Sequence, residues 1–346
     1  MKRIEDIDKN FFVKTESAEM DLYDAKEAPF KIYGLFHDGT RFRRMPEEMA
    51  KQVNDGVFSL HTCTAGGRVR FKTDSNFVFI KAVMDGILKM QHITLTGSGG
   101  FDIYADSHYA GSFVPPMDMT DGYESKTVFH EKKMRQITIN FPLYSNVQEL
   151  YIGLEKGAKV EEAEEYRYTK PIVYYGSSIT QGGCASRPGN AYQAIITRRM
   201  DIDHINLGFS GSAKGEDSIA EYIAGLEQSV FVMDYDCNAP NAEHLKKTHR
   251  RMYEIVRERN PELPIVFISA HTCMFVSDAD ERREIIRKNY EDAKNAGDEN
   301  IYHINGREML DYADRDIMTV DGIHPNDFGF WCIAQVLEKV LREIIK

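Results

Sequence analysis

The sequence predicts two folds in succession: an all-β sandwich or jelly roll, then an α/β domain with a parallel sheet covered by helices on both faces. In the first half, short alternating segments are separated by turn residues at intervals of roughly ten residues. In the second half, short apolar segments alternate with longer amphipathic ones. The acidic stretch 161–165 lies between the two patterns and is the expected linker. We therefore expect a β-sandwich domain over residues 1–165 and an α/β domain over residues 166–346.

Composition and charge favour an ordinary globular protein. The chain has 346 residues, of which 42% are hydrophobic and 28% charged, and its formal net charge is -11. This acidic balance argues against a nucleic-acid partner, because such proteins present a basic face to phosphates. No stretch approaches the ~18 apolar residues of a membrane span, and the charged N-terminus does not resemble a signal peptide. We therefore expect a cytoplasmic protein with neither a nucleic-acid nor a membrane partner.

The five cysteines predict neither a disulfide framework nor a metal centre. They are odd in number, widely spaced, and form no Cys-x-x-Cys pair. Reduced thiols are the simplest interpretation, and we expect no metal or other cofactor.

The first half contains several candidate strands and one short helix. A helical turn or two is expected over residues 46–54, before the strands begin. The glycines of residues 97–100 predict a β-turn, because no lysine or helix start follows as a phosphate-binding loop requires. The strands are expected at 68–71, 76–83, 92–96, 101–104, 136–141 and 149–154.

The second half predicts a parallel sheet covered on both faces. Its strands are expected at 172–175, 204–207, 230–235, 265–269 and 301–304, and its helices at 190–200, 217–228, 242–259, 278–296 and 327–345. Ligands bind such sheets at the carboxyl ends of the strands. The segments that leave this edge are residues 176–180, 208–212, 236–241 and 271–273.

The first strand ends in Gly176, Ser177 and Ser178, which admit two interpretations. Glycine and serine are ordinary turn residues, and most such turns carry no chemistry. Alternatively, one serine is a nucleophile held at a strand-to-helix turn, which requires a base and an oxyanion site nearby. A cysteine nucleophile at Cys184, Cys237 or Cys273 is a weaker alternative, because none has a histidine at a diagnostic spacing.

Two histidines follow an aspartate at a spacing that can orient an imidazole base. His204 follows Asp201 but begins a strand, at the amino edge of the sheet. His324 follows Asp321 in a loop before the last helix, from which it can reach over the carboxyl edge. A loop histidine that only caps the helix is the alternative.

Oxyanion donors are expected at the ends of the next two strands. The turn ending at Gly211 offers backbone N–H groups, and Asn238 offers a side-chain amide, with Asn241 as its alternative.

In this order, Gly176-Ser177-Ser178-Ile179, the glycine turn, Asn238 and Asp321-x-x-His324 resemble the sequence blocks of the SGNH (GDSL-type) hydrolases over residues 170–346. The resemblance implies a flavodoxin-like three-layer fold for this half of the chain. It also implies that Ser178 is the nucleophile, that His324 is the base and that Asp321 orients it. It further implies an oxyanion hole built from the N–H of Ser178, the N–H of Gly211 and the side chain of Asn238.

The first half carries a weaker resemblance. Residues 100–104, Gly-Phe-Asp-Ile-Tyr, are similar to the GxDLY motif of the β-sandwich domain that precedes some SGNH esterases. The chain departs from the family pattern at two places. Ser177 stands where the family usually has aspartate, and Asp236-Cys237-Asn238-Ala239 stands where it usually has Gly-x-Asn-Asp.

The resemblance implies a serine esterase that removes short acyl groups, acetyl above all, from carbohydrate or other small esters. Its expected partner is a small-molecule or oligosaccharide ester substrate. Two alternatives remain: an acyltransferase with the same triad, and a carbohydrate-binding protein whose hydrolase domain has decayed. The sequence does not distinguish them and does not predict an oligomeric state.

Overall fold

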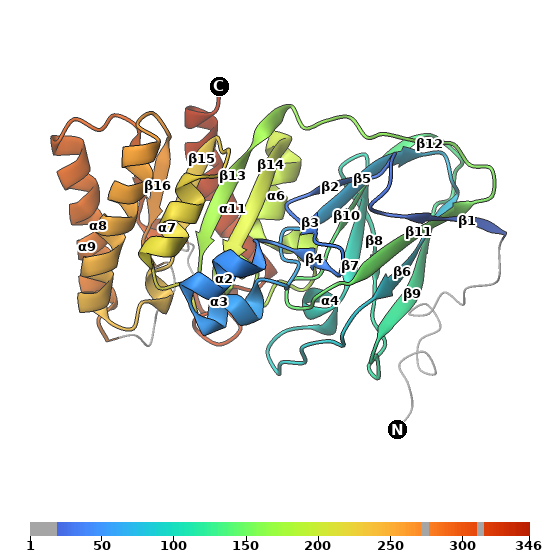
Figure 1. Cartoon of the computed structure of the whole chain (residues 1–346), viewed down its shortest axis with the longest axis horizontal. Helices are drawn as coiled ribbons and strands as arrows, with labels where there is room; N and C mark the ends of the chain where they lie inside the picture. Colours follow the sequence, from blue (N-terminus) through green and yellow to red (C-terminus); the bar gives the residue numbers. More distant parts are fainter. Residues whose placement is uncertain (1–18, 271–276, 310–314) are drawn as a thin grey trace.

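A computed structural model describes residues 19–270, 277–309 and 315–346. Figure 1 shows a β-sandwich on one side of the molecule and an α/β region on the other.

The sandwich consists of two antiparallel sheets. One sheet has the strand order β1 (Met20–Asp24), β11 (Glu149–Glu155), β6 (Phe77–Val83), β9 (Gly122–Val128). The other has the order β12 (Val160–Glu161), β5 (Arg68–Thr73), β10 (Arg135–Asn140), β7 (Phe101–Ala105), β8 (His108–Phe113), with β2 (Lys31–Tyr33) also paired to β5. A separate small hairpin joins β3 (Phe36–His37) to β4 (Phe42–Arg43).

The inner faces of the two large sheets enclose an apolar core. Alternate residues of the strands point into it, as the two-residue period of a strand requires. Its buried members include Phe71, Ile80, Ile103, Ile139 and Ile152. The predicted β-sandwich is confirmed.

The segment before β7 differs from the prediction of a strand over 92–96 and a β-turn over 97–100. It forms the helical turn α4 (Leu95–Ser98), whose N-cap Thr94 accepts a hydrogen bond from the N–H of Gly97 at 3.1 Å. The hydroxyls of Thr94 and Thr96 both donate to the carbonyl of Ser186, in the second half of the chain. Capping and these long-range bonds outweigh the β propensity of the threonines, so both predictions were wrong.

The second half is a parallel sheet with the strand order β14-β13-β15-β16-β17. In chain order this is 2-1-3-4-5, the flavodoxin-like arrangement, and the predicted fold class is confirmed. The strands are β13 (Tyr168–Gly176), β14 (Ile202–Gly208), β15 (Val230–Asp234), β16 (Ile265–Ile268) and β17 (Ile301–Ile304).

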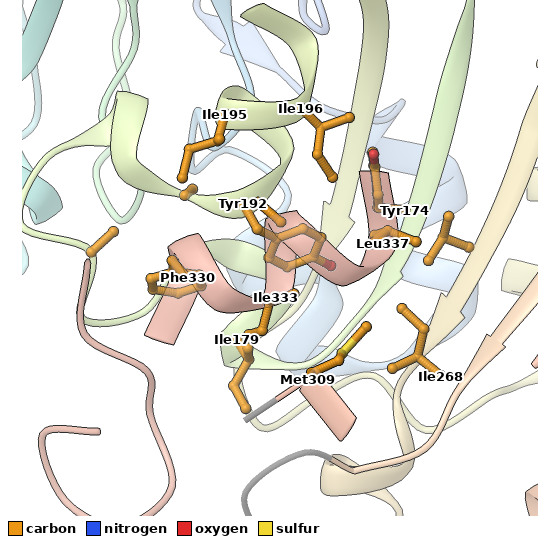
Figure 2. Close-up of a cluster of buried hydrophobic side chains, with 14 of the residues drawn as sticks. Tyr174, Ile179, Tyr192, Ile195, Ile196, Ile268, Met309, Phe330, Ile333 and Leu337 are labelled. Atoms are coloured by element: carbon orange, nitrogen blue, oxygen red, sulfur yellow. The ribbon is translucent and has the colours of Figure 1, made fainter. Parts of the chain in front are cut away.

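Helices cover both faces of this sheet. Tyr174 of β13 packs toward α6 (Tyr192–Met200) and α11 (Asp327–Ile344), in the cluster shown in Figure 2. The next residue, Tyr175, belongs to the cluster on the other face. That face is covered by α7 (Asp217–Ala224), α8 (Ala242–Arg259) and α9 (Ala279–Asn295).

Two helices of the first half join the core of the second. In Figure 1, α2 (Glu47–Val53) lies beside α7, and α3 (Asp55–Leu60) packs on α2. Their buried residues Ala50 and Val57 belong to the cluster that contains Tyr175. The side-chain amide of Asn54 donates to the carbonyl of Ser212 at 3.0 Å. The hydrophobic cores therefore do not follow the predicted division into residues 1–165 and 166–346.

The described helices include none that is long and apolar enough to cross a membrane. Four cysteines, Cys63, Cys184, Cys237 and Cys332, form no disulfide among the described residues, and the fifth, Cys273, lies outside the described residues, as does His271.

Candidate active site

The two serines at the end of β13 have different roles. The chain leaves the strand through Gly176, where a Cβ atom would lie 2.1 Å from the carbonyl oxygen of Asp234, so only glycine fits. Ser177 is the N-cap of the short helix α5 (Ser178–Gln181), and its hydroxyl accepts a hydrogen bond from the N–H of Ile179 at 3.2 Å. The helix cap thus occupies the hydroxyl of Ser177 and leaves that of Ser178 for another partner.

That partner is the imidazole of His324. The Oγ of Ser178 lies 2.9 Å from Nε2 of His324, and Nδ1 of the same ring lies 2.7 Å from Oδ2 of Asp321. The other carboxylate oxygen accepts the backbone N–H groups of Ile323 and His324. The three side chains therefore form a continuous chain of hydrogen bonds between a hydroxyl, an imidazole and a carboxylate, the arrangement that activates serine in hydrolases.

The charge of Asp321 fixes the role of each ring nitrogen. Burial alone would raise the pKa of Asp321, but the backbone and ring N–H groups of His324 and the backbone N–H of Ile323 outweigh it. Together they lower the pKa from 3.8 to about 2. An ionised carboxylate only accepts hydrogen bonds, so Nδ1 of His324 carries a proton. In the neutral ring, Nε2 is then the acceptor that faces Ser178.

Backbone and side-chain contacts hold the two ends of the loop that carries His324. An isolated bridge joins Thr319 to Pro325, and the N–H of Val320 donates to the carbonyl of His324 at 2.9 Å. Asn326 ends the loop as the N-cap of α11 and accepts hydrogen bonds from two backbone N–H groups of the first turn. These contacts fix the imidazole relative to the sheet.

The strand order brings the proposed oxyanion residues to either side of Ser178. Gly176 pairs with Gly208 of β14 on one side and with Asp234 of β15 on the other. The turn after β14 contains Gly211, whose φ of 68° is the left-handed conformation that glycine adopts without strain. Among the described residues the N–H of Gly211 has no hydrogen-bond partner, and the N–H of Ser178, at the first position of a helix, has none within α5.

The two candidate amides after β15 differ in their contacts. Asn238 ends the 3₁₀ turn η3 (Asp236–Asn238), and its Oδ1 is buried with no partner among the described residues. Asn241 is the N-cap of α8, and its side-chain oxygen accepts the N–H of His244 at 2.8 Å. Capping accounts for the side-chain oxygen of Asn241, whereas the side-chain oxygen of Asn238 has no such role among the described residues.

Residues of the first half support helix α5, and the sequence did not predict these contacts. The hydroxyl of Tyr144 donates to the carbonyl of Ser178 at 3.2 Å. The side chain of Gln181 donates to the carbonyl of Leu143 and accepts the N–H of Ser210. No local pattern identifies Tyr144 or Gln181, because their partners are distant in sequence.

The second Asp-x-x-His segment lies elsewhere. His204 is 1% exposed, and its ring contacts the hydroxyl of Thr197 at 2.6 Å and Nη1 of Arg68 at 3.2 Å. Burial, with a smaller contribution from the charge of Arg68, holds the pKa of His204 well below its ordinary value. It is a buried neutral histidine at the contact with the β-sandwich.

Two further side chains lie beside His324. The ring of His92, in the loop before α4, lies 5.4 Å from the His324 ring between centroids. Cys184 is buried, and burial, together with the negative charge of Asp321, raises the pKa of its thiol to about 12. A thiol with this pKa is a poor nucleophile at neutral pH, which argues against the cysteine alternative at this position. His92, Cys184 and His324 form a group of potential metal ligands that the sequence analysis did not detect, because they are far apart in the chain.

Comparisons with known proteins identify the family of the chain. The family model described as the GDSL-like lipase/acylhydrolase family matches residues 169–342, and the model for the N-terminus of SGNH-hydrolase-type esterases, named GxDLY, matches residues 20–160. A search of curated proteins finds no match.

Solved structures show the same fold over almost the whole chain. A putative GDSL-like lipase from Bacteroides ovatus is 26% identical with a TM-score of 0.86, covering 94% of this chain and 98% of that one. The salicylyl-acyltransferase SsfX3 of a tetracycline biosynthetic pathway is 19% identical, with a TM-score of 0.78 and the same coverage. A family two carbohydrate esterase from Clostridium thermocellum, in complex with cellohexaose, is 14% identical with a TM-score of 0.61, covering 81% and 93%. The chain is an ester hydrolase that belongs to the GDSL-like lipase/acylhydrolase family.

Proposed function

We propose that this protein is a serine esterase in which Ser178 is the nucleophile, His324 the general base and Asp321 the residue that orients it. The observation that carries the proposal is the chain of hydrogen bonds from Ser178 through His324 to Asp321, at 2.9 and 2.7 Å. The intact geometry of these three side chains argues against a decayed hydrolase domain, because without catalysis there is no function that would preserve both hydrogen bonds.

The reaction proceeds in two halves. Oγ of Ser178 attacks the ester carbonyl carbon while Nε2 of His324 takes the hydroxyl proton. The tetrahedral intermediate then expels the alcohol, which receives that proton, and an acyl-enzyme remains on Ser178. Water attacks the acyl group, again giving a proton to His324, and the carboxylic acid leaves as Oγ regains its hydrogen.

The oxyanion is stabilised by three donors in this proposal: the N–H of Ser178, the N–H of Gly211 and the amide of Asn238. Support comes from the N–H groups of Ser178 and Gly211, which have no partner within α5 and among the described residues respectively, and from the strand order, which puts the turns that carry Gly211 and Asn238 next to Ser178. Preorganised donors of this kind cost nothing to reorient as negative charge develops.

We infer that the acyl group is short, acetyl above all, and that the alcohol is a carbohydrate hydroxyl. Ser178 is only 8% exposed, and behind it a Cβ on Gly183 would lie 2.8 Å from the hydroxyl of Tyr144, so the space on that side is small. The rings of Phe328 and Trp331, at the start of α11, are stacked 6.1 Å apart and both exposed. Exposed aromatic rings close to a catalytic loop offer a flat apolar surface for the face of a sugar ring.

Trp331 also lines a cavity of about 360 Å³ together with polar side chains, which suits a ligand rich in hydroxyl groups. The polar residues that line it are Ser107, Asn190, Arg198, Arg199 and Asp327.

The test is a comparison of substrates in two variants. The wild-type protein should hydrolyse 4-nitrophenyl acetate faster than the butyrate and octanoate, and should release acetate from acetylated xylo- or cello-oligosaccharides. Trp331→Ala should lower kcat/KM for the oligosaccharide while the rate on 4-nitrophenyl acetate stays near that of the wild type. A preference for octanoate would contradict the short-acyl proposal, and equal losses on both substrates would contradict the role of Trp331.

An acyltransferase is the second candidate, because the fold extends at a TM-score of 0.78 to the salicylyl-acyltransferase. The two activities share the acyl-enzyme and differ in whether water or an alcohol attacks it. Product analysis with and without an added sugar acceptor distinguishes them, since transfer yields a new ester at the expense of free acetate.

A further inference from the structure

Three side chains that can ligate a metal converge beside the catalytic histidine. One ligand atom from each of His92, Cys184 and His324 lies within 4.8 Å of the other two. They come from the loop before α4, the turn after α5 and the loop before α11. His92 is exposed, Cys184 is buried and His324 is intermediate, so the group opens to solvent on one side.

The ligand set suits zinc. Thiolate sulfur and imidazole nitrogen are the ligands that Zn²⁺ takes in proteins, at about 2.3 Å and 2.0–2.1 Å. In a tetrahedral site with those bond lengths, neighbouring ligand atoms lie roughly 3.3–3.7 Å apart. Separations at the observed limit of 4.8 Å would have to shorten by about 1.1–1.5 Å, and the exposed His92 is the side chain with room to move.

The site is partly preorganised. Cys184 has a φ of 73°, the left-handed region that a residue with a Cβ adopts only where the surroundings impose it. The turn around it is fixed by hydrogen bonds from the N–H groups of Gly182 and Gly183 to the carbonyl of Ser178. Nδ1 of His324 is held by Asp321, the carboxylate partner that orients metal-binding histidines.

We propose that His92, Cys184 and His324 bind one Zn²⁺ ion, and that the bound ion inhibits the esterase by occupying Nε2 of His324. The inhibition rests on the proposed function, whereas the binding does not. Because Nδ1 of His324 is bonded to Asp321, Nε2 is the nitrogen left to coordinate, and it is the atom that accepts from Ser178. On binding, the Cys184 thiol releases its proton to solvent and forms an S–Zn bond, while each imidazole donates a lone pair. A chelator reverses these steps, and no oxidant is involved.

Binding can be measured without any reference to activity by titrating the metal-free protein with Co²⁺. A thiolate-bound Co²⁺ in a tetrahedral site gives a near-ultraviolet charge-transfer band and strong visible bands, which Zn²⁺ removes by displacement. We expect these bands in the wild type and expect Cys184→Ala to lose the charge-transfer band. His92→Ala should bind Co²⁺ at least about tenfold more weakly.

The matched controls are a cysteine and a histidine outside the group. Cys332→Ala removes a buried thiol of α11, and His108→Ala removes an exposed ring whose Nδ1 contacts the carbonyl of Asp106. Both should bind Co²⁺ as the wild type does. Absence of the charge-transfer band from the wild type, or its survival in Cys184→Ala, would overturn the site.

Inhibition is measured as the Zn²⁺ concentration that halves the hydrolysis of 4-nitrophenyl acetate, each variant being normalised to its own rate in chelator. His92→Ala and Cys184→Ala should require at least about tenfold more Zn²⁺ than the wild type and the two controls. Metal binding without inhibition, or activation by Zn²⁺, would overturn the inhibitory role. A wild type with no turnover even in chelator would contradict the proposed esterase function instead, and the Co²⁺ bands would still decide the metal site.

Discussion

Arg187, in the turn after the nucleophile helix, forms an ion pair with Asp102 of the β-sandwich, with Nη1 2.7 Å from Oδ2. Asp102 is the aspartate of the GxDLY-like segment and is fully buried. It also accepts hydrogen bonds from the side chain of Asn140 and the N–H of Gly189. The motif residue therefore holds the segment that follows Ser178 and α5 onto the sandwich.

Asp102→Ala should lower the free energy of unfolding by about 3–5 kcal/mol, because it leaves Arg187 and the buried amide of Asn140 without their acceptor. The control is Glu124→Ala, which removes the exposed pair between Lys81 and Glu124 and should cost no more than about 1 kcal/mol. Urea denaturation measures both. Equal small losses would show that the Asp102 contacts contribute little to stability.

The two serines should respond differently to substitution. Ser178→Ala removes the nucleophile and should reduce hydrolysis of 4-nitrophenyl acetate by several orders of magnitude. Ser177→Ala removes only the cap of α5 and should cost about 1 kcal/mol of stability while much of the activity remains. If Ser177→Ala were inactive and Ser178→Ala active, Ser177 would be the nucleophile and Ser178 would not.

The amide of Asn238 should matter to the rate and that of Asn241 to stability. Asn238→Ala should lower kcat by ~10²–10³, the effect of losing one oxyanion donor, with little change in KM. Asn241→Ala loses the cap of α8 and should destabilise the fold by about 0.5–2 kcal/mol at nearly normal kcat. The reverse pattern would assign the oxyanion role to Asn241.

The pH profile tests Asp321 and His324 together. A base must be neutral to accept a proton, so kcat/KM should rise with pH through the range in which an imidazole deprotonates. Asp321, with its pKa lowered to about 2, is ionised throughout and stabilises the imidazolium, so Asp321→Asn should reduce the rate by up to ~10⁴. It should also move the midpoint of the rise to lower pH, as measured between about pH 5 and 9. A profile that is flat and survives in His324→Ala would remove His324 as the base.

Asp236, the first residue of the turn η3 after β15, should make stability depend on pH. Burial raises its pKa to about 6, against the opposing effects of the Ala270 N–H and the charge of Arg282. The folded protein thus holds this proton more tightly than the unfolded chain. The resulting stabilisation is complete below about pH 4 and is lost as the pH rises through 6.

The side chain of Asp236→Asn stays neutral at every pH, so this variant does not lose stability when the wild type does. The free energy of unfolding of the variant, relative to that of the wild type, should therefore increase between pH 4 and pH 7. The expected gain is on the order of 3 kcal/mol. Urea titrations at the two pH values measure it, and a difference that stays constant with pH would contradict the raised pKa.

The sequence predicted most of the parallel sheet because each of its strands is a short apolar run bounded by turns. The amphipathic period placed α8 at residues 242–259, as in the structure. The segment around α4 was mispredicted because its conformation depends on Ser186, about ninety residues away. Local propensity carries no information about such a partner.

For the site, the local segments around Ser178 and Asp321-x-x-His324 were sufficient to nominate the residues that the structure brings together. Tyr144 and His92 were not recognised near Ser178 and His324, because their proximity arises only when the two halves of the chain pack together. Cys184 was considered only as an alternative nucleophile, and its place beside His324 and His92 depends on where the distant loops of those two residues lie. The role of Asp102 as an anchor was equally invisible, although its motif was noticed.

The packing of α2 and α3 against the second half has a consequence for how the protein melts. Removing residues 1–165 would expose the apolar surfaces that Ala50 and Val57 cover in the fold. The same truncation would also remove Tyr144, whose hydroxyl donates a hydrogen bond to the carbonyl of Ser178. The two halves should therefore unfold in a single calorimetric transition, and the α/β half should not be separable as an active fragment, even though family models recognise the two halves independently.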